Sequence, residues 1–163
     1  MATLTTVKGV NRTIKENVPQ EKLDVTQSYG KLRVLYDSYV IDAADEIGTS
    51  GLVRLFDIPK GARLISCEVG KPASGATGTF DLGWAASEEL DSSGATVEAA
   101  DADGIIAQAD PGGAALEGQK MPASRPGYMK LFAGAVEVQA DFSEITADSG
   151  GDTLEVTAFI VVD

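Results

Sequence analysis

The chain has 163 residues, which fits one domain able to bury a hydrophobic core of its own. It contains no histidine and a single cysteine, so an internal disulfide and a zinc site made of Cys and His are both excluded. The formal net charge of −12 disfavours nucleic acid as a partner, because phosphate backbones would be repelled.

Charge is unevenly distributed along the chain. Residues 1–33 hold six Lys and Arg against three Asp and Glu, whereas residues 34–163 hold seven against twenty-two. This contrast predicts an extended basic N-terminal arm over residues 1–29 and an acidic domain over residues 30–163. The first residues lack the apolar core of a signal peptide, and no apolar run approaches the roughly 18 residues of a spanning helix. We therefore expect a protein made in a cytoplasm, with no membrane partner.

Alternation of apolar and polar residues predicts that most of the first half of the domain is strand. The predicted strands span residues 30–41, 52–58, 62–69 and 79–84. One side of the first strand carries Leu32, Val34, Tyr36 and Val40. The last strand places its large apolar residues inward, and these are Phe80, Leu82 and Trp84.

A tight corner separates the second and third predicted strands. Pro59 fixes its own φ and cannot donate a backbone hydrogen bond, while Gly61 can adopt a positive φ. With Lys60 between them, the two residues predict a turn. In the strand that follows, we expect Cys67 on the core side together with Ile65. Cys67 is then a small core residue and not a reactive thiol, since no histidine is present to activate it.

Residues 85–127 break the alternating pattern and consist mostly of Ala, Gly, Ser and acids. A compact domain seldom contains so long an unstructured loop, so we expect an excursion with one short strand and one short helix near residues 101–110. Asp101 and Asp103 favour the start of that helix, because carboxylates there oppose the helix dipole and cap free amides. The part between residues 87 and 125 resembles an insertion.

The last third of the chain returns to clear alternation. Strands are predicted over residues 128–132, 135–142 and 154–162, and the stretch SGGDT between the last two has the chemistry of a hairpin loop. Together the elements predict an all-β fold. We expect an antiparallel β-sandwich, jelly-roll-like or Greek-key, with an extended N-terminal arm and one short helix in a long loop.

The sequence lacks the residues that most enzymes use. No histidine is available as a general base, and no G-x-S-x-G nucleophile elbow is present. Adjacent acids such as Glu88 and Glu89 lie in turn-like sequence that gives no indication of a substrate cleft. We therefore expect no catalytic activity, no cofactor and no metal centre.

Two ligand-binding alternatives remain open. Asp101, Asp103 and Gly104 match the third, fifth and sixth positions of an EF-hand loop. Asp110 matches the twelfth position, but Ala99 occupies the first, where an EF-hand has a carboxylate ligand. The sequence therefore allows weak calcium binding in an acidic loop and not an EF-hand site. Sandwich domains also bind carbohydrate, often through exposed aromatic side chains. Here the single tryptophan falls on an inward position of its strand, which gives no stacking platform.

Four stretches of the chain resemble small head proteins of tailed bacteriophages. They are KLRVLYDSYVI (residues 31–41), VRLFDIPKGARLISCEV (53–69), TFDLGWA (79–85) and TLEVTAFIVVD (153–163). In this order, after a polar and weakly basic arm, they resemble capsid decoration (cement) proteins. The resemblance covers most of the chain except residues 87–125, and Ile58 stands where leucine is commoner.

The resemblance implies a virion structural protein with a jelly-roll-like fold, made in the host bacterial cytoplasm. Such a protein attaches to the outer surface of the capsid by binding the major capsid protein, often as a homotrimer. A head-fibre or tail structural protein is the alternative with the same fold. The arm would then supply the contacts, through Val7, Lys8, Val10, Arg12, Ile14, Lys15 and Val18. The corner Pro59, Lys60 and Gly61 is a rigid turn that is also available for contact.

Overall fold

The computed structural model describes residues 6–8, 32–41, 51–71, 77–109, 116–146 and 152–162. These residues form nine strands and no helix, so they include no helix that could span a membrane. The strands are β1 (Thr6–Lys8), β2 (Leu32–Ile41), β3 (Gly51–Ile58), β4 (Ala62–Lys71), β5 (Thr77–Trp84), β6 (Asp101–Ala109), β7 (Leu116–Lys120), β8 (Val136–Thr146) and β9 (Asp152–Val162). The predicted all-β class is confirmed.

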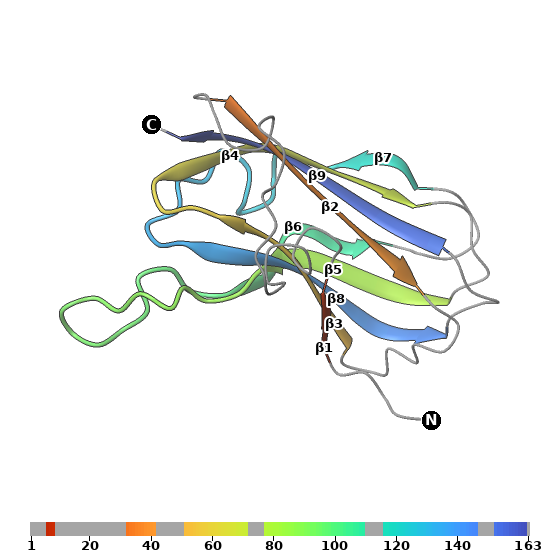
Figure 1. Cartoon of the computed structure of the whole chain (residues 1–163), viewed down its shortest axis with the longest axis horizontal. Coiled ribbons are helices and arrows are strands. Elements are labelled where there is room, and N and C mark those ends of the chain that lie inside the picture. Colours follow the sequence, from red (N-terminus) through yellow and green to blue (C-terminus); the bar gives the residue numbers. More distant parts are fainter. Residues whose placement is uncertain are drawn as a thin grey trace, which may run out of the picture.

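The strands form two sheets that lie face to face (Figure 1). One has five strands in the order β1-β3-β8-β5-β6, and the other has four in the order β2-β9-β4-β7. Every pairing is antiparallel except that of β1 with β3. From β2 onward, each step along the chain crosses to the other sheet apart from the step from β5 to β6.

The antiparallel pairs are nested in the sequence. β5 pairs with β6, β4 with β7, β3 with β8 and β2 with β9. These are the pairs of one long two-stranded ribbon. The contacts of β4 with β9 and of β5 with β8 then join parts of the ribbon side by side and close the two sheets over a core.

Alternating inward side chains fill the space between the sheets, as predicted for β5, β8 and β9. Phe80 and Phe142 stack with ring centroids 5.5 Å apart, and Trp84 meets Phe132 edge-on at 5.1 Å. In β8 and β9 the inward residues are Val136, Val138, Ala140, Phe142, Leu154, Val156, Ala158 and Ile160. Burial of this apolar surface is the main source of stability in a sandwich of this size.

The predicted strand over residues 30–41 is confirmed as β2, and its apolar side faces outward. Leu32, Val34, Tyr36 and Val40 are 60%, 39%, 40% and 50% exposed. The opposite side turns Asp37 and Tyr39 into the core, in register with β9. A shift of one residue in the strand register exchanges the buried side of a strand with the exposed side.

A bulge changes the expected alternation in β4. The register with β9 shifts between Leu64 and Ser66, so that Leu64 and Cys67 are both fully buried while Ile65 is not. The expectation for Ile65 was therefore wrong, because a bulge adds one residue and reverses the alternation. Cys67 is a core residue, as predicted.

The helix predicted near residues 101–110 is wrong, because residues 101–109 form β6. The strand pairs with β5, and both Ile105 and Ile106 are buried. Gly104 lies so close to the indole of Trp84 that an added Cβ would stand 2.4 Å from ring atoms. Packing of β-branched side chains and this close approach outweigh the local helix-start signals of Asp101 and Asp103.

Two further elements at the C-terminal side differ from expectation. Where a strand was predicted over residues 128–132, the chain has a turn that ends at Met129 and one isolated bridge, between Arg63 and Leu131. The SGGDT stretch does not close a hairpin, because β8 and β9 belong to different sheets and each pairs with other strands. Turn chemistry in the sequence marks a change of direction but does not say which strands pair.

Candidate interaction surfaces

The described part of the arm pairs with the protein's own sheet. β1 adds to the edge of β3, with Val7 beside Val53 and Lys8 beside Arg54. An exposed sheet edge is a standard site for strand addition. The other predicted arm contacts lie outside the described residues, namely Val10, Arg12, Ile14, Lys15 and Val18.

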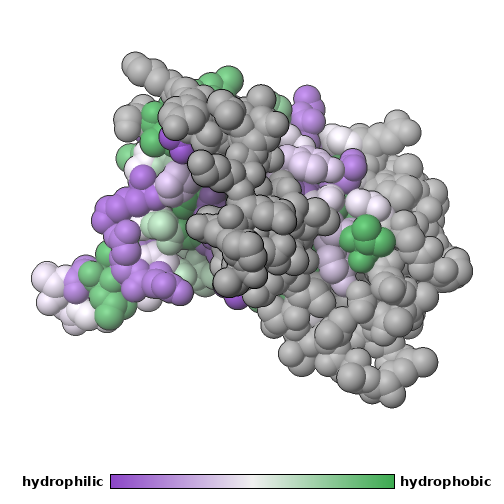
Figure 2. All heavy atoms as spheres, viewed as in Figure 1, coloured by the Kyte–Doolittle hydropathy of each residue, from purple (hydrophilic) through white to green (hydrophobic). Residues whose placement is uncertain are grey.

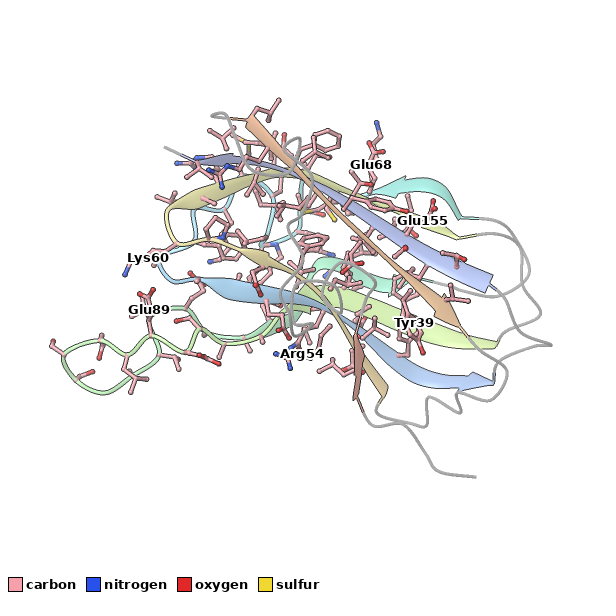
Figure 3. The ribbon with its side chains drawn as sticks, viewed as in Figure 1. Tyr39, Arg54, Lys60, Glu68, Glu89 and Glu155 are labelled. Atoms are coloured by element: carbon pink, nitrogen blue, oxygen red, sulfur yellow. The ribbon has the colours of Figure 1, made fainter. Side chains whose placement is uncertain are left out.

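The corner is the predicted tight turn between β3 and β4. The amide of Ala62 donates to the carbonyl of Pro59 at 3.1 Å, and Gly61 has φ of 76°. Gly61 also donates to the carbonyl of Phe132 at 2.9 Å, which ties the corner to the loop before β8. Lys60 is exposed and forms an ion pair with Glu89, which it faces across this end of the sandwich (Figure 3).

A loop between β5 and β6 projects from the same end of the sandwich (Figure 1). We call residues 85–100 the finger. Its two halves form a narrow ladder, with an isolated bridge between Leu90 and Thr96 and a hydrogen bond of 2.9 Å from the amide of Val97 to the carbonyl of Glu89. The finger is therefore an ordered hairpin-like element.

The carboxylate of Asp91 closes the tip of the finger. One oxygen accepts from the hydroxyl of Ser93 at 2.6 Å, from its amide at 2.8 Å and from the amide of Ala95 at 3.0 Å. The hydrogen bonds from Ser93, led by that of its hydroxyl, lower the pKa of Asp91 below its usual value. Gly94 supports the turn with φ of 82°.

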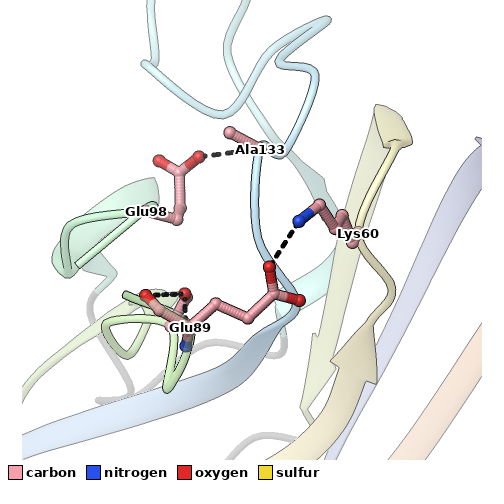
Figure 4. Close-up of polar contacts among 5 residues, drawn as sticks. Lys60, Glu89, Glu98 and Ala133 are labelled. Carbon is pink, nitrogen blue, oxygen red and sulfur yellow. Dashed lines mark hydrogen bonds and ion pairs between the residues drawn. The ribbon is translucent and has the colours of Figure 1, made fainter. Parts of the chain in front are cut away.

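The base of the finger is fixed to the loop before β8 by polar contacts. Glu98 is largely buried, accepts from the amide of Ala133 at 3.1 Å (Figure 4) and pairs with Lys130 at 2.9 Å. Lys130 in turn lies over the rings of Trp84 and Phe132, 5.5 and 5.6 Å from their centroids. This arrangement joins a cation–π contact to an ion pair at the edge of the core.

An apolar patch lies on that same loop. It consists of Tyr128, Met129 and Leu131, which are 44%, 43% and 49% exposed. Met129 has φ of 58°, in the left-handed region that non-glycine residues seldom adopt. The guanidinium of Arg63 donates to the carbonyl of Met129 at 2.8 Å and holds the turn in this form.

A groove of about 930 Å³ lies where the edges of the two sheets meet, between β2 and β3. Arg54 and Glu137 form a two-pronged ion pair on its wall, and Gln139 donates to the same carboxylate at 2.9 Å. The Nε of Arg33 is buried there without a hydrogen-bond partner among the described residues. The groove is thus lined by charge as well as by apolar side chains.

The described residues offer little for ligand chemistry. Burial raises the pKa of the Cys67 thiol to about 12, so it stays protonated. Within the described ranges no group of three or more His, Cys, Asp or Glu residues could hold a metal ion. Asp101 and Asp103 stand in a strand and not in a calcium loop, and Asp103 pairs with Arg125 at 3.1 Å. Trp84 is buried and cannot stack on a sugar.

Sequence reasoning missed the finger and the apolar patch. The stretch Asp91 to Gly94 has turn chemistry, and Leu90 and Val97 flank it at hairpin spacing, so a hairpin was detectable. The patch left no comparable signal in the sequence. Three of the four residues 128–131 are apolar, and such a run is as typical of a buried strand as of an exposed apolar patch.

No protein-family model and no curated protein matches the sequence. Solved structures with the same fold include a chain of the capsid of Ralstonia phage GP4, with a TM-score of 0.66 and 13% identity, over 97% of this chain and 98% of that one. A chain of the cyanophage Pam1 capsid asymmetric unit gives a TM-score of 0.54 and 16% identity, over 90% of this chain and 97% of that one. At such identities the likeness is one of fold.

Proposed function

We propose that this chain is a virion structural protein of a bacteriophage that binds the outside of the capsid and stabilises it as a decoration (cement) protein. The observation that carries the proposal is the shared fold, over nearly the whole length of both chains, with chains from two phage capsids. The sequence stretches that resemble head proteins favour the same class. The partner in this proposal is the major capsid protein.

The strand order supports a jelly roll as the finer description of the fold. A jelly roll has eight strands in two sheets, made by rolling a nested ribbon, and it occurs in viral capsid domains. Strands β2 to β9 form nested pairs of this kind, divided four and four between the sheets, and β1 is an addition at one edge.

The proposed role requires adhesion and no reaction. A cement protein holds neighbouring capsid subunits together by burying area across several of them, and binding as a homotrimer multiplies modest contacts. The buried, protonated Cys67 and the strand-bound acids are consistent with a protein without catalytic activity. Acidic charge on the domain would keep a decorated particle soluble.

In this proposal the arm supplies a contact to the capsid. Its net positive charge contrasts with the acidic domain, and β1 demonstrates that residues 6–8 can add to a sheet edge. The same backbone pairing is available to an edge of a neighbouring subunit. Ordering the arm along the shell would cost entropy, which the added hydrogen bonds and ion pairs offset.

The test is co-sedimentation with purified capsids that lack the protein. The full chain should sediment with them, and a variant without residues 1–28 should not, while its circular dichroism stays that of a folded β protein. A full chain that stays in the supernatant would contradict capsid binding. A truncated chain that sediments as well as the full one would contradict the role of the arm alone.

A further inference from the structure

We infer that the finger of one copy docks on the apolar patch of a neighbouring copy, so that copies of this chain join through a repeated finger-to-patch contact. The inference deepens the homo-oligomer part of the proposed function and rests on it. It assigns the two surfaces that make the contact.

The finger presents an ordered surface, and its residues 90–96 are exposed. Strand-like alternation divides its first half into two faces. Ser87 is buried and Glu89 pairs with Lys60, so these two face the body, whereas Glu88 and Leu90 are exposed. Glu88 stands at the rim of the groove between β2 and β3, which it helps to line. Leu90 is 62% exposed, and Figure 2 shows hydrophobic and hydrophilic atoms side by side on this projecting element.

The finger has a fixed conformation in the free chain, which lowers the entropy cost of binding. Its ladder, its closed tip and its anchored base fix the conformation before any partner arrives. A contact made by such an element avoids most of the entropy cost that a loose loop pays on ordering. An exposed leucine on a rigid projection is therefore a favourable anchor.

The patch has the complementary chemistry. Tyr128, Met129 and Leu131 offer apolar area, and Met129 holds a left-handed backbone that the surrounding contacts must sustain. Strain of this kind gathers at functional positions. Arg63 stands beside the patch, hydrogen-bonded to the Met129 carbonyl, and has no carboxylate partner among the described residues.

Charge favours a second copy as the occupant of the patch. The domain is strongly acidic, yet Arg63 beside the patch has no acidic partner among the described residues. Glu88 on the finger likewise has no basic partner within those ranges. Leu90 would meet the apolar side chains while Glu88 meets Arg63. Electrostatic matching of this sort sets orientation and register.

The contact cannot be satisfied within one molecule as it stands. Glu98 binds Lys130 and Ala133, so the base of the finger is attached to the loop that carries the patch, and the finger points away from it (Figure 1). Leu90 and the patch are all left exposed in the single chain. A contact between two different surfaces is heterologous, and it closes into a ring when the rotation between copies allows.

Cysteine cross-linking between two variants tests the contact. Leu90→Cys and Met129→Cys are purified separately, mixed and mildly oxidised; Cys67 stays in place because it is buried. The mixture should give a disulfide dimer that neither variant gives alone. The matched control mixes Leu90→Cys with Val40→Cys, which replaces an equally apolar and half-exposed side chain on β2.

The outcomes separate this inference from the capsid proposal. If the wild type sediments as an oligomer and the test mixture cross-links no more than the control, the finger-to-patch contact is overturned while the oligomer stands. If the wild type is a monomer throughout the concentration range, both the finger-to-patch contact and the proposed homo-oligomer are contradicted. Capsid co-sedimentation is measured independently and decides the capsid proposal by itself.

Changing the charge of Glu88 gives a second measure. Glu88→Lys and Glu88→Gln should each weaken self-association by about fivefold, as expected for one exposed ion pair, and Glu88→Asp, which keeps the charge, should largely retain it. Analytical ultracentrifugation provides the association constants, and circular dichroism verifies folding. If Glu88→Lys and Glu88→Gln both associate like the wild type, the assigned pairing is overturned.

Discussion

The paired sheets and the finger keep their shapes by different means. From Val136 to Phe142 in β8 every second side chain is buried between the sheets, whereas nearly every residue from 88 to 96 in the finger is exposed. The finger depends instead on main-chain hydrogen bonds, on the carboxylate of Asp91 and on ion pairs at its base. Buried apolar area therefore holds the domain together, while a few polar groups determine the conformation of the finger.

The largest effect should come from the core. Phe142→Ala removes a fully buried ring that packs against Phe80 and leaves a cavity in the core between the two sheets. We expect the free energy of unfolding to fall by about 3–5 kcal/mol, measured by chemical denaturation. Leu32→Ala is the matched control, since Leu32 is 60% exposed on β2 and its loss should change stability by less than about 0.5 kcal/mol.

A smaller effect should come from the base of the finger. Glu98→Ala removes the partner of Lys130 and of the Ala133 amide, and we expect a loss of about 2 kcal/mol, because a largely buried charged group loses its hydrogen bonds. Faster hydrogen exchange at the amides of Ser87 and Val97 should accompany it. Glu88→Ala, at an exposed position, should change neither quantity. Equal behaviour of the two variants would contradict the role assigned to Glu98.

The same contrast separates what the sequence could predict from what it could not. Strict alternation predicted β5, β8 and β9 with the correct inward faces, because one buried side leaves a period-2 pattern. The corner was predictable since Pro59 and Gly61 each restrict or permit a specific φ. Such signals are local, so they can be recognised without knowing which distant segments pack against the strand or the turn.

The remaining features depend on contacts between distant segments. Nothing near Asp101 indicates that Trp84 will lie against Gly104 and favour a strand, and nothing near Glu98 indicates Lys130 as its partner. The assignment of β8 and β9 to different sheets likewise comes from packing and not from their link. The arm residues Val7 and Lys8 gave no sign that they would pair with β3.

Two glycines with positive φ lie in the two regions, Gly61 at the corner between β3 and β4 and Gly94 at the tip of the finger. Gly61→Ala places a Cβ in open space but at φ of 76°, so we expect a purely conformational loss of about 1 kcal/mol in the free energy of unfolding. Gly94→Ala has the same conflict at φ of 82° in the exposed tip. It should speed hydrogen exchange in the tip and leave global unfolding nearly unchanged. An equal global loss in both would mean that the tip unfolds together with the sheets.

The smallest effect should be a pH response confined to the tip. Hydrogen bonds from Ser93 and Ala95 lower the pKa of Asp91 in the folded state, so they favour its charged form. Their support is present above the unfolded pKa of about 3.9 and is lost as pH falls through the lower folded value. NMR should therefore detect amide shifts of Ser93 and Ala95 only in strong acid, and Asp91→Asn should abolish this titration. A tip that titrates alike in both proteins would remove Asp91 as the group that closes the finger.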